Sequence, residues 1–398
     1  MLSVDEAQTR ILKSASPLDR EASEISDALE RALVSAISAQ RTLPPWDNSA
    51  MDGYAVIASD VVDAPVKLKI AQTIFAGDRP TIALERGTCA RIMTGAPLPP
   101  GADAVVMQEK ARPESEGRVS IDEAARAGAN VRKRGEDIVV GAPLFEAGRV
   151  ISLSDAGALW SQGLTTVEVF RRPRVAIASS GDELADLGSA DVEKIIDSNS
   201  PVIAEGVKRA GGVATRLGRA RDTLDSHVAL FERGLAQHDV LITIAGASVG
   251  EKDFTREALL ELGVEIDFWK VAMKPGKPLA FGRRGKTLVF GLPGNPVSAM
   301  VTFELFVRPA LRALQGLSAL PPHRTAHLGA PIHKAAGLRH FVRATTAVRD
   351  GVLWASPLAS QSSGGLASAS GATCLIDVAE AETHIEAGSE IRVFPLSW

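Results

Sequence analysis

The sequence has little cysteine, histidine and tyrosine. Its 398 residues include two Cys, seven His and one Tyr, and the two Cys, Cys89 and Cys374, lie far apart in the chain. Zinc and iron–sulfur sites are built mainly from clustered Cys and His ligands, so the composition argues against either. The simplest prediction for two distant Cys is free thiols in a reducing compartment.

Long apolar runs and an excess of basic residues are also missing. The net charge is −4, and no apolar stretch approaches the roughly 20 residues that a membrane-spanning helix needs. The acidic, helix-patterned N-terminus is unlike a secretory signal peptide. We therefore expect a cytoplasmic protein that binds neither nucleic acid nor membrane.

A chain of this length usually forms more than one domain, and the sequence pattern changes along it. Apolar residues at helical spacing run through 3–40, where helix is predicted. Residues 44–130 contain short strand-like runs separated by Gly and Pro, which predicts an inserted β-rich domain.

From 171 to 316, short apolar strands alternate with helix patterns, as in 174–179, 201–210 and 213–217. This alternation predicts βαβ units, with a parallel sheet covered by helices on both faces. The last roughly 75 residues predict a small β-barrel-like domain. The predicted fold is thus a multidomain α/β protein, with these domains: 1–43 plus 131–170 (helical and linker), 44–130 (inserted β), 171–318 (α/β) and 319–398 (small β).

The segment Phe290-Gly-Leu-Pro-Gly-Asn-Pro-Val-Ser-Ala299 is the most informative in the chain. It predicts a strand, a Gly-Pro turn and a helix, with Asn295 at the N-cap and Pro296 at N1. A helix start of this kind has free N–H groups that suit phosphate. Two ammonium groups, Lys274 and Lys277, lie just upstream on a stiff turn. A well-capped helix explains the first segment alone, whereas the two segments together predict an oxyanionic ligand.

In an open α/β sheet, ligands bind at the carboxyl ends of the strands. Loops predicted at these ends carry five carboxylates beside the Lys pair: Asp182, Glu183, Asp197, Asp222 and Asp253. Carboxylates next to ammonium groups suit a Mg²⁺ ion that bridges to phosphate oxygens. For Asp222 and Asp253, a helix N-cap is an equally good explanation. No G-x-G-x-x-G follows a strand, which argues against a Rossmann dinucleotide site.

Seven motifs, in order along the chain, resemble those of the MoeA-type molybdopterin molybdenumtransferases, a family that includes the C-terminal domain of gephyrin. They are Asn48-Ser-Ala-Met-Asp-Gly-Tyr-Ala55, Met93-Thr-Gly-Ala-Pro-Leu-Pro-Pro-Gly-Ala-Asp103, Arg134-Gly-Glu-Asp137, Ser180-Gly-Asp-Glu-Leu184, Asp197-Ser-Asn199, Lys274-Pro-Gly-Lys-Pro278 and Gly291-Leu-Pro-Gly-Asn-Pro-Val-Ser298.

The resemblance implies an elongated four-domain protomer that forms a homodimer, in which the inserted β domain covers the partner's cleft. It implies a reaction in which molybdate and adenylylated molybdopterin are the substrates, molybdenum is inserted into the dithiolene, and AMP is released with the help of Mg²⁺. Other proteins of molybdenum cofactor biosynthesis are implied as further partners.

The resemblance also implies roles for individual residues. Asp253, Ser248, Lys274 and Lys277 would be catalytic, and Asp253, Glu183 and Asp222 would hold the metal. Substrate-binding positions would be Asp52 and Thr94 from the inserted domain, together with Asp137, Gly181, Asp182, Glu183, Asp197, Asp222, Pro278, Pro293, Gly294, Asn295, Pro296, Ser298, Arg343, Ser362 and Ser363. Of these, Arg343 and the two Ser would reach molybdate. One departure is Ala245, where the family usually carries Gly; its Cβ disfavours a positive φ, so a shifted loop is expected.

Two other functions fit parts of the pattern. Molybdopterin adenylyltransferases resemble only the α/β domain, and the additional domains of this chain argue against that activity. A molybdopterin-binding scaffold without turnover is the other alternative, and the presence of Asp253 and both Lys favours an enzyme. A preference for molybdate over tungstate cannot be deduced from the sequence.

Overall fold

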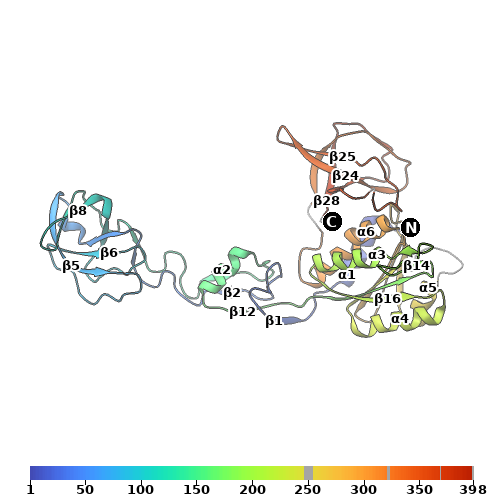
Figure 1. Cartoon of the computed structure of the whole chain (residues 1–398), viewed down its shortest axis with the longest axis horizontal. Coiled ribbons are helices and arrows are strands. Elements are labelled where there is room, and N and C mark those ends of the chain that lie inside the picture. Colours follow the sequence, from blue (N-terminus) through green and yellow to red (C-terminus); the bar gives the residue numbers. More distant parts are fainter. Residues whose placement is uncertain (246–253, 321–322, 368, 397–398) are drawn as a thin grey trace. The chain divides into compact units, whose positions relative to one another are not determined.

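The computed structural model describes residues 1–245, 254–320, 323–367 and 369–396. The chain forms two compact units (Figure 1): the larger comprises Met1–Val34 and Val167–Trp398, and the smaller comprises Ser35–Thr166. Each unit is described by itself. Within the described ranges, no helix is both long enough and apolar enough to cross a membrane.

The larger unit is built on a six-stranded sheet. Its strand order is β16 (Val213–Ala220), β13 (Arg174–Ser180), β17 (Val240–Ile244), β21 (Thr287–Leu292), β20 (Pro278–Arg284) and β18 (Glu265–Lys270). The first four strands are parallel, but β20 runs antiparallel to both of its neighbours. The predicted parallel arrangement is therefore confirmed for these four strands, whereas the sheet as a whole is mixed. Only Gly285 and Lys286 separate β20 from β21, and so short a connection can join only antiparallel strands.

Helices cover both faces of this sheet, as predicted. On one face α1 (Val4–Ser14), α3 (Asn199–Arg209) and the helical run α6–η3–α7 (Pro296–Thr302, Phe303–Val307, Arg308–Leu314) share a core with Val175, Ile177 and Ile242. On the other face α4 (Leu224–Gln237) and α5 (Thr255–Glu261) pack on Ala176, Ala178 and Leu241. Successive strand residues thus point to opposite faces, and both sets are buried.

The predicted N-terminal helix is much shorter than expected. It ends at Ser14, and the chain continues through β1 (Arg20–Glu24), which pairs with β12 (Thr166–Phe170). Pro17 explains the break, because proline disfavours helical geometry in the residue before it and cannot donate a backbone hydrogen bond. The later apolar residues at helical spacing, such as Ile25 and Leu33, are buried in turns and bridges instead.

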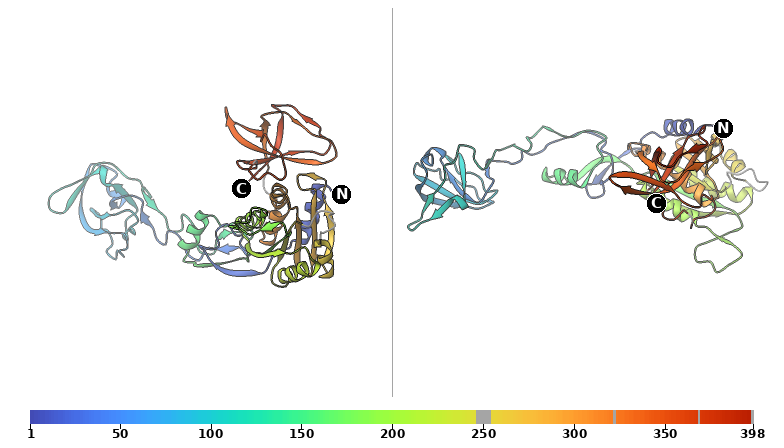
Figure 2. Two further views of the ribbon diagram at one scale, coloured as in Figure 1. Left: turned by 45° about the vertical axis from the view of Figure 1, so that its right-hand side comes forward. Right: turned by 90° about the horizontal axis from the view of Figure 1, so that it is seen from above.

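A closed β-barrel follows near the C-terminus and confirms the predicted small β domain. Five strands form the ring: β24 (Arg339–Arg349), β25 (Val352–Pro357), β22 (Arg324–Leu328), β28 (Glu390–Pro395) and β26 (Cys374–Val378). The pairing of β24 with β26 closes it, and β19 (Met273–Lys274) adds to β24 from outside the ring. The left view in Figure 2 shows the barrel strands, in orange and red, gathered apart from the yellow and green sheet.

The smaller unit is rich in β-structure, as predicted. Its six-stranded sheet has the order β7 (Ala104–Met107), β4 (Gly53–Val56), β6 (Thr88–Ile92), β5 (Val66–Ile74), β9 (Arg118–Ile121) and β8 (Ala111–Pro113). The rest of the unit contains two short strand pairs and one helix. The pairs are β3 (Asn48–Ser49) with β10 (Val131–Arg132) and β2 (Ile37–Ser38) with β11 (Pro143–Phe145), and the helix is α2 (Leu153–Ser161). The individual domain limits given above stay predictions.

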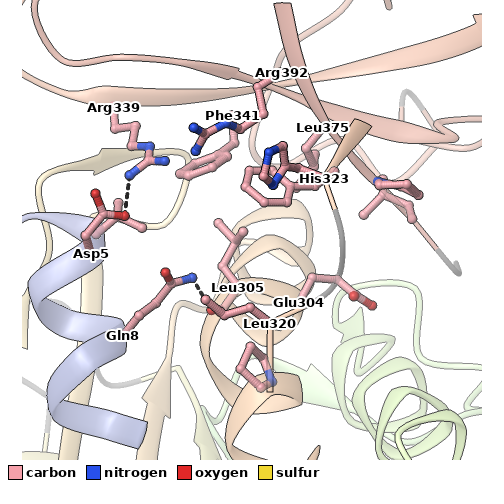
Figure 3. Close-up of a pocket in the computed structure, with 15 residues that line it drawn as sticks. Asp5, Gln8, Glu304, Leu305, Leu320, His323, Arg339, Phe341, Leu375 and Arg392 are labelled. Atoms are coloured by element: carbon pink, nitrogen blue, oxygen red, sulfur yellow. Dashed lines mark hydrogen bonds and ion pairs between the residues drawn. The ribbon is translucent and has the colours of Figure 1, made fainter. Parts of the chain in front are cut away.

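Arg339 connects the barrel to α1. Its Nε and Nη2 each donate to the Asp377 carboxylate at 2.7 Å, and its Nη1 donates to Asp5 Oδ1 at 2.7 Å. Figure 3 shows Arg339 and Asp5 at the rim of an apolar cavity of about 230 Å³ between α1, η3 and the barrel. None of the predicted site residues lines this cavity.

Replacing Arg339 with Leu is expected to destabilise the barrel. The change removes two short charge-assisted bonds to Asp377, a carboxylate whose side chain is only 6% exposed. Breaking a buried ion pair from one side costs about 3–5 kcal/mol. Hydrogen exchange of the β24 and β26 amides measures this cost as a fall in the local opening free energy.

The matched control is Arg10→Ala, because the Arg10–Asp267 pair at 2.8 Å is exposed on both sides. Exposed pairs contribute about 0–1 kcal/mol. If the two variants lowered the opening free energy by the same amount, the buried pair would not be what holds the barrel strands.

Candidate functional site

The sheet carries the predicted site loops to one edge. The carboxyl ends of β13, β16, β17, β18 and β21 lie there, because these strands run in the same direction. The reversed strand β20 begins at the same edge, so the turn with Lys274 and Lys277, which joins β18 to β20, lies there too. The antiparallel strand therefore leaves the predicted convergence of loops intact.

A cavity of about 580 Å³ opens at this edge. Seven of the predicted site residues line it: Glu183, Asp197, Pro278, Pro293, Gly294, Asn295 and Pro296. Its other lining residues are Ser179, Leu184, Ile195, Ile196, Ser198, Asn199, Ile244, Ala245 and Gly364. The cavity volume falls within the range typical of small-molecule sites.

Asp197 braces one wall of this cavity. Its carboxylate is buried and accepts from Ser179 Oγ at 2.9 Å, from Ser200 Oγ at 2.5 Å and from the Ser200 N–H at 3.0 Å. Ser200 does not cap the helix predicted over 201–210, since α3 already begins at Asn199 and the Ser200 hydroxyl is bound to Asp197. The geometry gives Asp197 a structural contribution to the site.

The backbone at the start of α6 has the predicted N-cap and first helical residue, but the Asn295 side chain does not make the capping hydrogen bond. Asn295 is the N-cap and Pro296 is the first helical residue. The Asn295 side chain donates to Ser363 Oγ at 3.2 Å instead of capping the helix, and the Val297 N–H donates to the Ser363 carbonyl at 3.2 Å. One of the N–H groups expected to be free for phosphate is thus taken by the loop that follows β25.

Arg343 has a different position from the one expected. It is 1% exposed, and its guanidinium donates to the backbone carbonyls of Ser362 at 3.0 Å and Ser360 at 2.9 Å. Gln361 completes the clamp by accepting from the Arg343 N–H and donating to the Arg343 carbonyl. The expectation of a guanidinium free to bind molybdate is corrected: Arg343 holds the loop that reaches α6, and burial lowers its pKa.

Lys274 and Lys277 are exposed on the turn that precedes Pro278; Pro278 lines the cavity, and the two lysines are not among its lining residues. Within the described ranges neither ammonium group has a hydrogen-bond or ion-pair partner. Between them Gly276 has φ of 97°, and a Cβ there would collide with the Thr302 side chain. Close packing of the turn on α6 thus requires glycine, and it leaves both cations available to an anion.

The predicted carboxylates lie on separate loops of the same edge. Glu183 and Asp182 are exposed after β13, and Asp222 follows β16, the neighbouring strand. Asp222 is not an N-cap, because Thr223 occupies that position of α4 and accepts from the Ser226 N–H. Gly181 has φ of 128°, and a Cβ there would strike the Glu183 carboxylate.

Ser248 and Asp253 lie outside the described residues. The loop that carries them begins at Ala245, which has φ of 70°. Ala245 thus adopts a positive φ although its Cβ disfavours it, and the expected avoidance of that geometry is not found at this residue. A left-handed geometry costs an alanine about 1–2 kcal/mol, and the Ala245 N–H still donates to the Leu292 carbonyl at 3.2 Å.

In the smaller unit, two predicted residues meet. Asp52 Oδ1 accepts from the Thr94 N–H at 2.6 Å and from the Thr94 hydroxyl at 2.8 Å, and these bonds lower the pKa of Asp52. Asp137, also predicted, is exposed elsewhere in the unit. Asp52 and Thr94 thus form one polar corner in which the carboxylate stays ionised.

Sequence reasoning missed three groups that shape the cavity. Ser179 binds Asp197, Asn199 Nδ2 donates to the Gly294 carbonyl at 2.7 Å, and Gln361 binds the backbone of Arg343. Ser179 and Asn199 lie in segments already singled out as strand-end loops, so their position was a signal. Gln361 gave no signal, because its contacts depend on a strand far from it in sequence.

Fold and site together define a multidomain protein with a cavity at the carboxyl edge of its α/β sheet. Family models match three parts of the chain: the MoeA N-terminal region (domains I and II) at residues 2–163, a probable molybdopterin-binding domain at 176–313, and the MoeA C-terminal region (domain IV) at 325–396.

Full-length relatives agree with these matches. The chain is 37% identical over 373 residues to molybdopterin molybdenumtransferase 2 of Mycobacterium tuberculosis, covering 91% of each chain. It is 33% identical over 402 residues to molybdopterin molybdenumtransferase of Haemophilus influenzae, covering 100% of this chain and 99% of the relative. The crystal structure of a molybdopterin biosynthesis MoeA protein from Pyrococcus horikoshii superposes with a TM-score of 0.85 at 30% identity over the whole of both chains. The chain belongs to the MoeA family of molybdopterin molybdenumtransferases.

Replacing Arg343 with Lys is expected to loosen the loop 360–363. An ammonium group has no planar fork with which to bridge two carbonyls, so at least one of the two bonds is lost. Hydrogen exchange at residues 360–364 and at the Val297 amide should become faster. The control, Arg349→Lys at the C-terminal end of β24, should leave hydrogen exchange in both segments at the wild-type rate. Equal exchange rates in the two variants would contradict the inference that Arg343 holds the loop 360–363.

Proposed function

We propose that this chain is a molybdenum insertase that acts on adenylylated molybdopterin. It takes molybdate as the second substrate, places molybdenum in the dithiolene and releases AMP. The observation that carries the proposal is the 580 Å³ cavity at the carboxyl edge of the sheet, which Pro278 lines, with exposed Lys274 and Lys277 on the turn that leads to Pro278. The names of the full-length relatives support the same reaction.

The edge offers separate places for the two substrates. The cavity between Asn199, Gly294 and Glu183 is large enough for a pterin phosphate, and its walls are fixed by the Asp197 and Asn199 hydrogen bonds. Lys274 and Lys277 supply positive charge without a protein counter-ion, which favours a dianion such as molybdate. Ser362 and Ser363, held by Arg343, supply polar groups next to α6.

Asp253 and Ser248 complete the proposal as catalytic groups. In this proposal, Asp253 positions the water that cleaves the pyrophosphate bond, and Ser248 binds substrate from the same loop. Lys274 and Lys277 stabilise the charge that develops on the leaving phosphate and on the oxyanion. Fixed cations at a site of developing charge are an effective means of lowering a reaction barrier.

Magnesium is the proposed metal, and the carboxylates are compatible with it. Within the described ranges, no three His, Cys, Asp or Glu side chains are grouped as a metal site. Magnesium in phosphate sites is commonly held by one or two carboxylates together with substrate oxygens, so a complete protein cage is not needed. Asp253 and Glu183, with Asp222 from the adjacent strand, would hold it, and bound Mg²⁺ would polarise the phosphoryl oxygens.

A homodimer in the cytoplasm is part of the proposal. Asp52 and Thr94 tie two loops together at an exposed surface, and this polar corner fits a role in covering the cleft of a partner subunit. Other proteins of molybdenum cofactor biosynthesis would then deliver adenylylated molybdopterin and receive the product.

Release of AMP from adenylylated molybdopterin, dependent on molybdate, tests the proposal directly. Asp253→Asn should lower the rate about 10²–10⁴-fold, because the amide cannot orient or deprotonate water as a carboxylate does. Asp225→Asn, in the exposed first turn of α4, is the matched control and should keep the wild-type rate. A wild-type rate in Asp253→Asn would remove that residue from the catalytic groups, and tight pterin binding without turnover in the wild type would indicate the scaffold.

Mixing subunits tests the shared cleft. Asp52→Ala and Asp253→Asn are each expected to be inactive, whereas their mixture should recover about one quarter of the wild-type activity, since half of the dimers are hybrids with one intact cleft each. Mixing Asp52→Ala with Thr94→Val should recover nothing, because both changes affect the same side of the cleft. Equal recovery in the two mixtures, or none in either after confirmed subunit exchange, would contradict a cleft built from two subunits.

A further inference from the structure

His340 lies directly beside one of the proposed anion-binding cations. It is in β24, where it is the register partner of Lys274 in β19 on one side and of Val378 in β26 on the other. Register partners on adjacent strands present their side chains to the same face of the sheet. The half-buried imidazole therefore shares a face with the Lys274 side chain.

One nitrogen of this imidazole is buried without a partner. His340 Nδ1 is inaccessible to solvent and makes no hydrogen bond within the described part of the chain. Buried polar atoms in folded proteins are nearly always paired, so an exception calls for an explanation. The roles assigned above to the site residues do not use this histidine.

The charges around His340 are mainly positive. Lys334, on the segment before β24, has its ammonium group fixed by the carbonyls of Leu338 at 3.0 Å and Glu380 at 3.1 Å. Lys274 comes from β19 and Arg343 from β24 itself. The Asp377 carboxylate, on β26, is bound by Arg339, and the Glu380 side chain lies on the loop after β26.

The imidazole is uncharged in this setting. Burial, followed by the positive charges of Lys274, Lys334 and Arg343, lowers the pKa of His340 to about 4. The same positive potential that keeps the proton away would attract an oxyanion. A bound dianion would offset that potential and favour the protonated imidazole.

We propose that His340 is a positioning residue of the oxyanion site: its imidazole takes up a proton when a tetrahedral dianion binds beside Lys274, and the imidazolium then helps to hold that anion. The inference rests on the proposed function, because it places the oxyanion at Lys274. It adds His340 to the proposed site residues and adds the uptake of one proton to the binding of the anion.

The proposal makes the affinity for the anion depend on pH. Binding raises the pKa of His340, so between about pH 4 and the pKa in the complex each bound anion brings up to one proton with it. The affinity should then increase as the pH falls, by up to tenfold per pH unit within that window. Above the pKa in the complex the affinity should no longer depend on this group.

Calorimetry measures the proton directly. Molybdate, and sulfate as a dianion that does not itself titrate above pH 4, are bound to the full chain between pH 5.5 and 8 in two buffers of different ionisation enthalpy. The wild type should take up protons and bind more tightly at lower pH. His340→Asn should take up none and should show an affinity that does not change with pH, while matching the wild type at pH 8.

His327→Asn is the matched control, because His327 is a half-buried histidine on another strand of the same barrel, with Nδ1 bound to the Gly388 carbonyl. It should keep the proton uptake of the wild type. If His340→Asn fails to fold, nuclear magnetic resonance of the wild-type imidazole decides: His340 should stay neutral to about pH 4 in the free protein and become protonated at higher pH when sulfate is added.

Equal proton uptake in wild type and His340→Asn, or an imidazole that does not respond to sulfate, would overturn the role of His340. If the wild type then still binds both anions and releases AMP, the proposed function stands and only the role of His340 is wrong. If the wild type binds neither anion and releases no AMP, both the function and this inference are wrong.

Discussion

The direction of the strands is the constraint on which the site depends. Four neighbouring parallel strands, β16, β13, β17 and β21, end at one edge of the sheet, and the reversed β20 begins there. Residues separated by more than a hundred positions, such as Gly181 and Asn295, are thereby brought to one rim without specific contacts between them. The helices that bury the two faces keep this edge open to a ligand.

The barrel adds the second part of the site through hydrogen bonds. Arg343 and Gln361 fix a loop whose Ser363 binds the N-cap residue Asn295 and the Val297 amide. A buried guanidinium bound to carbonyls is costly to desolvate, and it persists because both of its bonds are well formed. The site is therefore sensitive to residues that do not face the ligand.

Much of this arrangement could be predicted from the sequence. Alternating apolar strands and helix patterns identified the sheet, and the Gly-Pro segment at 290–299 located the start of α6, because these signals are local. The reversal of β20 depends on the two-residue turn at Gly285 and Lys286, which was not recognised as a hairpin. The helix predicted through 3–40 failed because spacing alone does not distinguish a helix from buried turns, and Pro17 was overlooked.

Residue roles were harder to predict than positions. Arg343 was recognised as a site residue by resemblance, yet its guanidinium is bound to Ser360 and Ser362, and only the tertiary structure shows that. The environment of His340 likewise requires β19, β24 and β26 to be in place. Lys274 and Lys277 lie close together in sequence on one exposed turn, and the positive potential of two such cations favours an anion.

The central claim is that the carboxyl edge of the sheet, beside Lys274 and Lys277, binds the oxyanion substrate. A crystal structure of the full chain with molybdate, with molybdenum located by its anomalous scattering, tests it most directly. The account predicts one strong molybdenum peak within ion-pair distance of the two ammonium groups and near the loop 360–363. Molybdenum found only at the opposite edge of the sheet, near Arg171 and Arg174, would contradict it.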